Sequence, residues 1–181
     1  MLFALVVLLG AVVIGYAAGG RLGRLGDLRL RRGVLVVLAV LAQAGGSLLG
    51  GRAYPAGLAV SVLLVAVFLT QNRGVRGTGL VALGLLSNAL VVGLNGAMPV
   101  SADTSGRAGI STQDILSGAD PRHELAGAHT HLRWLGDVVP VLLPARPEVV
   151  SVGDVLVASG LAQLLVLGMT AGRTVGRRVT R

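Results

Sequence analysis

The segment AYPAGLAVSVLLVAVFLTQN, residues 53 to 72, contains no arginine, lysine, aspartate, glutamate or histidine. A helix of about 17 to 25 apolar residues is long enough to cross roughly 30 Å of hydrocarbon. Its apolar residues fall on every side of the helix, which disfavours a half-buried amphipathic helix of a soluble domain. The segment therefore predicts a transmembrane helix.

The same pattern recurs along the chain, in segments 2–20, 33–51, 77–102 and 155–172. Only 13% of the residues are charged, against roughly 25% in soluble domains, and the mean hydropathy is +0.78. We therefore expect an all-α fold, with residues 1–181 forming a single membrane domain. Its five spans are predicted at about 2–20, 33–51, 54–71, 78–95 and 152–172, with an external loop at 96–150. The first span lacks a basic segment before it, so we expect a retained helix rather than a cleaved signal.

The basic residues are all arginines, and their distribution is uneven. Eleven arginines and one acid lie on one side of the predicted spans, a charge of +10, whereas five arginines and seven acids give −2 on the other. This asymmetry follows the positive-inside rule. It predicts a cell-membrane protein with its N-terminus and the loop outside and its C-terminus in the cytoplasm. Because topology accounts for the net charge and no nucleic-acid-binding motif is present, we expect the lipid bilayer and not a nucleic acid as partner.

Three polar residues lie near mid-depth of the predicted spans: Gln43, Asn88 and Gln163. Polar side chains in hydrocarbon are costly unless paired, and they often mark a pathway or a site. We expect these three to form hydrogen bonds between helices. No charged residue or histidine lies in a span core, which argues against a proton-coupled pump or an ion exchanger.

Helix stop and start signals flank the predicted loop. Asn95-Gly96, followed by Pro99, predicts the end of the fourth helix, because glycine adopts a left-handed conformation and proline prevents continuation. At the other end, Ser151 and Asp154 have the spacing of a capping box, with a hydrophobic staple between Val150 and Val155. We therefore expect a structural role for Asp154.

These junction motifs resemble those of an uncharacterised family of bacterial multi-span membrane proteins, known only as a domain of unknown function. The resemblance extends to Gln43, to LRLRRG at residues 28–33, and to a set of loop residues: Met98-Pro99-Val100-Ser101, Thr130, Leu132, Leu135-Gly136-Asp137, Pro140 and Ser151-Val152-Gly153-Asp154. It implies the membrane architecture and the importance of the loop. No activity, cofactor or catalytic residue comes with it.

The segment HELAGAHTHLRWLGD, residues 123–137, contains all three histidines and the single tryptophan. A metal site could use His123, His129 and His131 with Asp137 or Glu124. The H-E-x-x-H motif fails, however, because position 127 is glycine. The absence of cysteine excludes structural disulfides and thiolate ligands.

Acid–base or nucleophilic catalysis is a second interpretation of this segment, but no G-x-S-x-G elbow surrounds any serine. We favour a third, in which the polar groups bond locally and fix a cap over the helices, with Arg133 and Trp134 at headgroup level. No catalytic residue, metal or cofactor is then expected. Asp137 lies between two apolar runs, so we expect it to accept hydrogen bonds from backbone N–H groups or a loop arginine.

The sequence thus favours a non-enzymatic multi-pass membrane protein whose outward cap binds a partner protein or a lipid-like ligand. The alternative is a small membrane enzyme or transporter acting on a lipid-linked or amphipathic substrate at the outer face. That alternative predicts a water-filled pocket where the loop meets the helices. The candidate polar cluster for either function comprises Asn88, Asn95, His123, His129, His131, Asp137 and Asp154.

Overall fold

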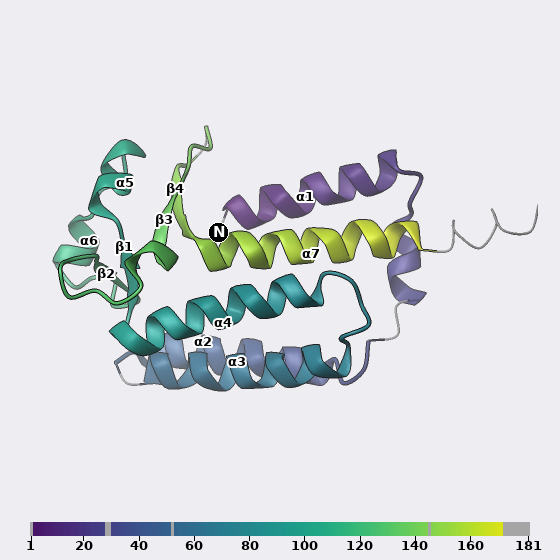
Figure 1. Ribbon diagram of the computed structural model, residues 1–181, viewed down its shortest axis with the longest axis horizontal. Helices are drawn as coiled ribbons and strands as arrows, with labels where there is room; N and C mark the ends of the chain where they lie inside the picture. The colour runs from purple at the N-terminus through teal and green to yellow at the C-terminus, as the bar shows by residue number, and fades with distance from the viewer. Residues whose placement is uncertain (1, 28–29, 52, 145, 172–181) are drawn as a thin grey trace, which may run out of the picture.

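The computed structural model describes residues 2–27, 30–51, 53–144 and 146–171 (Figure 1). Five long helices run side by side in this part of the chain: α1 (Leu2–Ala17), α2 (Val34–Leu49), α3 (Ala53–Gln71), α4 (Thr78–Asn95) and α7 (Val152–Thr170). They pack as successive neighbours in the order α1, α7, α4, α3, α2. A folded cap formed by the segment between α4 and α7 lies at one end of these helices (Figure 1).

Three of the helices, α3, α4 and α7, are long and apolar enough to cross a membrane, with 18 to 19 residues and mean hydropathies of 1.6 to 2.1. The other two are apolar but shorter than the sequence predicted, with 16 residues each and a length of about 24 Å. Helix α1 ends early in a Schellman motif. Gly19 is left-handed, and the N–H groups of Gly20 and Gly19 donate to the carbonyls of Gly15 and Tyr16.

The expectation of an all-α fold is wrong for the segment 96–150. This segment contains the strands β1 (Met98–Val100), β2 (His123–Leu125), β3 (Asp137–Val141) and β4 (Glu148–Ser151), together with the short helices α5 (Ala102–Arg107), α6 (Gln113–Leu116) and η2 (Arg133–Leu135). The strands form one sheet in the order β2-β1-β3-β4, with β1 parallel to both neighbours and β4 antiparallel to β3. Strands of three to five residues are too short to show a reliable alternation of apolar and polar positions, so only a valine-rich apolar run was recognisable in the sequence.

Both predicted signals at the ends of the cap are confirmed. Gly96 is left-handed, with φ of 87°, and its N–H donates to the carbonyl of Val92 at 2.7 Å. At the start of α7, the Ser151 side chain accepts from the Asp154 N–H while the Asp154 carboxylate accepts from the Ser151 N–H. The cap therefore leaves α4 and enters α7 through two defined turns.

The N-terminal end of α1 lies at the cap end of the helices (Figure 1). The Glu148 carboxylate of β4 accepts hydrogen bonds from the N–H groups of Leu2 and Phe3, at 2.9 and 3.0 Å. Burial tends to raise the pKa of Glu148, but hydrogen bonds to the carboxylate, among them those from Phe3 and Leu2, outweigh burial and lower the pKa to about 2. A carboxylate at a helix N-terminus also interacts favourably with the helix dipole.

The opposite end of the helices carries an excess of arginines. The 3₁₀ helix η1 (Leu22–Asp27) follows α1 there, and the Arg24 guanidinium donates to the Met169 carbonyl at 3.2 Å. Nearby, the buried Asn72 at the end of α3 bonds both the N–H and the carbonyl of Arg31, at 2.9 and 3.1 Å. Side chains thus pair backbone groups of Met169 and Arg31 at this end of the helices.

Helices α4 and α7 touch backbone to backbone through two glycine pairs. A Cβ atom added to Gly160 would lie 2.7 Å from the Gly77 carbonyl oxygen, and one added to Gly84 would overlap the Gly153 carbonyl oxygen. Small residues at such intervals allow helix backbones to approach closely. Just beyond the second pair, a Cβ on Gly153 would overlap the Asn88 side chain, so the glycine also makes room for that amide.

Substitution of Gly84 by alanine is expected to destabilise the helix bundle by about 1 to 3 kcal/mol, since the added methyl meets backbone that cannot move aside. Gly93→Ala on the same helix is the matched control, because a Cβ there meets nothing within 4 Å. Unfolding of each purified variant in detergent measures the difference. Equal stability of the two variants would contradict the tight α4–α7 contact.

Candidate functional site

The polar residues singled out in the sequence lie where the cap meets the ends of α4 and α7. Asn88 Nδ2 donates to Asp154 Oδ1 at 2.8 Å, and Ser151 Oγ donates to Asn88 Oδ1 at 2.9 Å. Asp154 Oδ2 accepts from the Ser151 N–H at 3.3 Å. Asn88 therefore pairs between helices as predicted, and Asp154 serves in the helix cap. This closed set of contacts satisfies polar groups that would be costly to bury alone.

Asn95, in the last turn of α4, fixes a different part of the cap. Its Oδ1 accepts from the His131 N–H at 2.8 Å, and its Nδ2 donates to the His131 carbonyl at 2.9 Å. The side chain also donates to the Val91 carbonyl at 2.8 Å. The amide thus matches a backbone donor and acceptor simultaneously, and the imidazole of His131 takes no part in the contact. Asn95 and Asn88 face separate partners rather than a shared pocket.

Asp137 is the most deeply buried acid of the cap, with only 6% of its surface exposed. It begins β3, where its backbone is paired with Val100 on one side and Ser151 on the other. Burial raises the pKa of the Asp137 carboxyl to about 7, and the negative charges of Asp154 and Asp120 act in the same direction. The carboxylate is thus placed where its charged form is disfavoured.

A histidine is the nearest partner of this carboxylate. His123 Nε2 lies 3.5 Å from Asp137 Oδ2. This distance is long for a hydrogen bond, so the contact does not offset the effect of burial on the pKa of Asp137. The expected backbone N–H or arginine partner is absent from the side-chain contacts of Asp137 within the described residues. That expectation is therefore wrong, and the physical reason is the strand geometry, in which the Asp137 backbone makes the sheet contacts while its side chain faces β2.

The other nitrogen of His123 contacts a second acid. His123 Nδ1 lies 2.8 Å from Asp120 Oδ2, and Asp120 also pairs with Arg122 Nε at 3.0 Å. Burial tends to raise the pKa of Asp120, but the hydrogen bonds from Arg122 and His123 outweigh it and lower the pKa to about 2. The result is a chain of contacts from Arg122 through Asp120 and His123 to Asp137. With both ring nitrogens facing carboxylates, His123 has no free nitrogen to present to a substrate.

The three histidines do not converge. His129 and His131 are exposed, whereas His123 is partly buried. Among the residues that the structure describes, no group of three or more His, Asp or Glu side chains has a geometry that could hold a metal ion. The clustering of the histidines in sequence therefore does not produce a cluster in space.

The other two mid-span residues differ from Asn88. Gln43 on α2 and Gln163 on α7 are exposed on the helix surface, and neither side chain is hydrogen-bonded to the described part of the chain. The prediction that they bond between helices of this chain is therefore wrong.

The sequence did not reveal three residues whose side chains fix the cap or the helix ends: Asp120, Asn72 and Glu148. Asp120 stands two positions before Arg122 and three before His123, so its pairing with them is suggested by a local charge pattern. Asn72 and Glu148 act on backbone groups more than 40 and 140 residues away. No local pattern reports such distant pairings.

A groove of about 500 Å³ opens on the cap beside this network. It lies between the start of α5, the end of β2, η2 and β3, and its lining includes Ser101, Asp103, Arg133, Trp134 and Val138. The Trp134 side chain is 63% exposed. Arg133 is exposed and has no ion-pair partner among the described residues. The groove thus combines the apolar face of Trp134 with one cation, Arg133, and one carboxylate, Asp103, which form no ion pair with each other.

Comparison with known proteins identifies the family but no activity. Residues 27–166 match a family described as "Family of unknown function (DUF5317)". An uncharacterized protein of Thermotoga maritima is 33% identical over 113 residues, an alignment that covers 60% of this chain and 61% of that protein. No solved structure matches the chain. The chain belongs to the DUF5317 family, and the matched region contains both the cap and most of the helices.

The pKa of Asp137 predicts the pH dependence of stability. Because the folded-state pKa is raised from 3.8 to about 7, the folded protein holds this proton more tightly than the unfolded chain does. The free energy of unfolding should therefore fall as the pH rises from about 4 to about 7, by at most about 1.4 kcal/mol per pH unit. Asp137→Asn, which stays neutral, is expected to remove this fall.

Thermal unfolding of the purified protein in detergent at pH 5 and pH 7 measures the effect. Asp103→Asn is the control, because Asp103 is an exposed carboxylate of the same cap. If wild type and Asp137→Asn lose the same stability between the two pH values, the buried carboxyl is not the titrating group.

Proposed function

We propose that this member of the DUF5317 family is a five-span protein of the cell membrane whose outward cap binds an amphipathic, lipid-like ligand. The groove beside Trp134 and Arg133 carries this proposal. A tryptophan offers a broad apolar surface, and aromatic residues concentrate at the membrane–water interface. A guanidinium recognises phosphate or carboxylate groups in a bidentate manner. Together they fit a molecule with an apolar part and an anionic group.

The helix surfaces support the membrane location. In the candidate spans α3, α4 and α7, only 22 to 28% of the residues are buried within the chain, although the helices are almost wholly apolar. Large exposed side chains such as Leu9, Val40 and Leu63 would be exposed to water in a soluble protein. Hydrocarbon removes that cost. Helices α1 and α2 are short for a span but equally apolar, and tilt-free insertion of their 16 residues needs only modest thinning of the bilayer.

The charge distribution supports the orientation. Arg24 contacts Met169 near the end of α7, and Arg31 contacts Asn72, the neighbour of Arg73, at the end of α3; both contacts lie opposite the cap, whereas most of the acids lie in the cap. Under the positive-inside rule the arginine end is cytoplasmic and the cap is outside. The N-terminal end of α1, next to Glu148, is then outside as well.

The arrangement of the polar cluster favours binding over catalysis. Asp154 is engaged by Asn88 and by the Ser151 N–H, and His123 lies between two carboxylates. These groups hold the cap against α4 and α7, so that the groove is presented on a fixed support. An enzyme or transporter would instead use them as working groups, and the contacts leave them little freedom for that role.

The orientation is tested with reporter fusions in a bacterial host. A reporter active only in the cytoplasm should be active when fused after Arg181, and one active only outside should be active when inserted after Gly118, an exposed turn of the cap. The protein should also require detergent for extraction. Activity of the external reporter after Arg181, or a chain that stays dispersed without detergent, would contradict the proposal.

Ligand binding is tested through Trp134, whose fluorescence reports on the groove because it is the only tryptophan. Titration with short-chain phosphatidylglycerol should give a saturable emission change, stronger than with phosphatidylcholine of the same chain length. Arg133→Gln should abolish this preference for the anionic lipid, whereas Arg107→Gln, an exposed arginine outside the groove, should retain it. An equal response to both lipids, or an equal effect of both variants, would exclude the proposed role of Arg133.

A further inference from the structure

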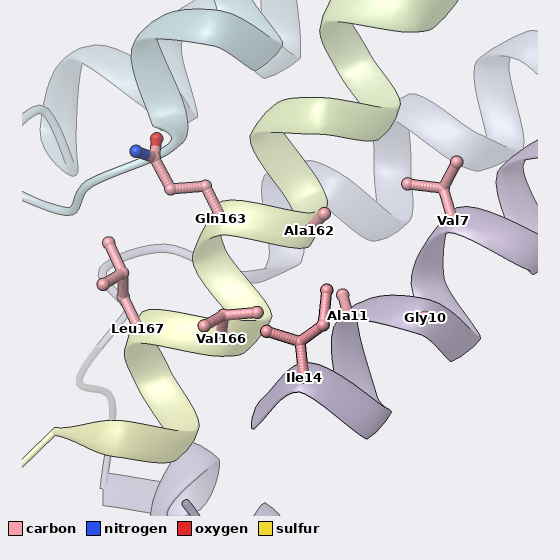
Figure 2. A pocket seen from close by; sticks show the side chains of 8 residues that line it. All are labelled: Val7, Gly10, Ala11, Ile14, Ala162, Gln163, Val166 and Leu167. Carbon is pink, nitrogen blue, oxygen red and sulfur yellow. The ribbon is translucent and has the colours of Figure 1, made fainter. Parts of the chain in front are cut away.

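A second groove lies between α1 and α7 (Figure 2), and its lining differs chemically from that of the cap groove. Its volume is about 410 Å³, and its lining is apolar apart from one amide, that of Gln163. The α1 side includes Gly10 and Ala11, and the α7 side includes Ala162. A Cβ atom added to Gly10 would meet nothing within 4 Å, so the groove is open beside this glycine.

Gln163 places a polar group on this apolar surface. It lies eleven residues after Val152 and seven before Thr170, or about 16 Å and 10 Å from the two ends of α7. Figure 2 shows its side chain extended away from α1, and it is hydrogen-bonded to nothing in the described part of the chain. At this depth of a bilayer there is no water to satisfy an amide, so an unpaired one is costly.

We propose that a second copy of this chain packs on the α1–α7 groove, with the two Gln163 amides hydrogen-bonded to each other across a two-fold axis. The inference rests on the proposed membrane location. A lipid tail could fill the groove, but it has neither a donor nor an acceptor for the amide. A carboxamide has both, so an identical amide at the same depth is a complete partner. A two-fold axis beside Gln163 brings the same residue of the second copy to this position, so each amide is the partner of the other.

The groove suits such a contact in shape as well. Small residues let helices of different chains approach closely, and an interhelical hydrogen bond then adds to the packing. Gly10, Ala11 and Ala162 are such small residues, and they line the groove together with Gln163. The other small-residue contact of α1, at Gly15, is already filled by Met169 of the same chain, so it is closed to a partner.

Gln43 provides a matched control for the chemistry. It too is an exposed amide in an apolar helix, but α2 packs on α3 at the other end of the row of helices, away from the groove. Gln163→Leu and Gln43→Leu therefore remove the same polar group from two different faces. Both positions are exposed, so neither change should disturb the fold.

The test is the monomer–dimer equilibrium of purified protein in lipid vesicles. It is measured by energy transfer between labelled copies at increasing ratios of lipid to protein. Gln163→Leu should weaken the dimer roughly 3- to 30-fold, the range of one interhelical hydrogen bond. Gly10→Leu, whose Cβ meets nothing within 4 Å and whose side chain would occupy the open groove, should abolish the dimer. Gln43→Leu and Gly93→Leu, a substitution at an equally open glycine of α4, should leave it unchanged.

Cross-linking in native membranes gives an independent readout, because the natural chain has no cysteine. Oxidation of Gln163→Cys should yield a disulfide-linked dimer, whereas Leu63→Cys, at an exposed position of α3, should not. A chain that is monomeric in lipid, or a dimer unaffected by Gln163→Leu and Gly10→Leu, would overturn this inference while leaving the membrane location intact. Equal weakening by Gln43→Leu and Gln163→Leu would overturn the two-fold arrangement. A protein that is not in the membrane would overturn the proposed function first.

Discussion

The contact between α4 and α7 is the constraint on which the rest of the structure depends. The chain leaves the helices at the end of α4, forms the whole cap and returns at the start of α7. Because Gly77 and Gly84 let α4 touch the backbone of α7, the two ends of the cap are held close together. The polar contacts of Asn88 with Ser151 and Asp154 then join these ends directly.

The cap is anchored at two further points by side chains that bond backbone groups. Asn95 holds His131, and Glu148 holds the first turn of α1. The sheet itself places Asp137 between strands that come from both ends of the cap segment. Loops of more than about 15 residues without secondary structure of their own are uncommon and are usually functional or disordered. Here the anchors turn a long connection into a rigid support for a groove.

The distribution of polar groups divides the molecule into three kinds of surface. Polar groups at the cap junction are paired within the chain, as Asn88 and Asp154 are. The cap groove presents Arg133 without a partner, and the α1–α7 groove presents Gln163 without one. In hydrocarbon an unpaired amide carries a cost that pairing removes, whereas a guanidinium beside an aromatic surface gains charge-assisted hydrogen bonds when it meets an anionic group. The two grooves therefore have separate occupants in our proposals: a lipid-like molecule and a second copy of the chain.

The sequence by itself determined the five apolar helices, the stop at Gly96 and the capping box at Ser151 and Asp154, because hydrophobic runs and helix caps are local properties of a few consecutive residues. Only the tertiary structure decided the sheet of the cap, the pairing of His123 with Asp120 and Asp137, and the exposure of Gln43 and Gln163. These depend on contacts between residues distant in the chain, and on which face of a uniformly apolar helix meets a neighbour. A helix that is apolar on every side carries no periodicity to reveal that face, so packing alone selects it.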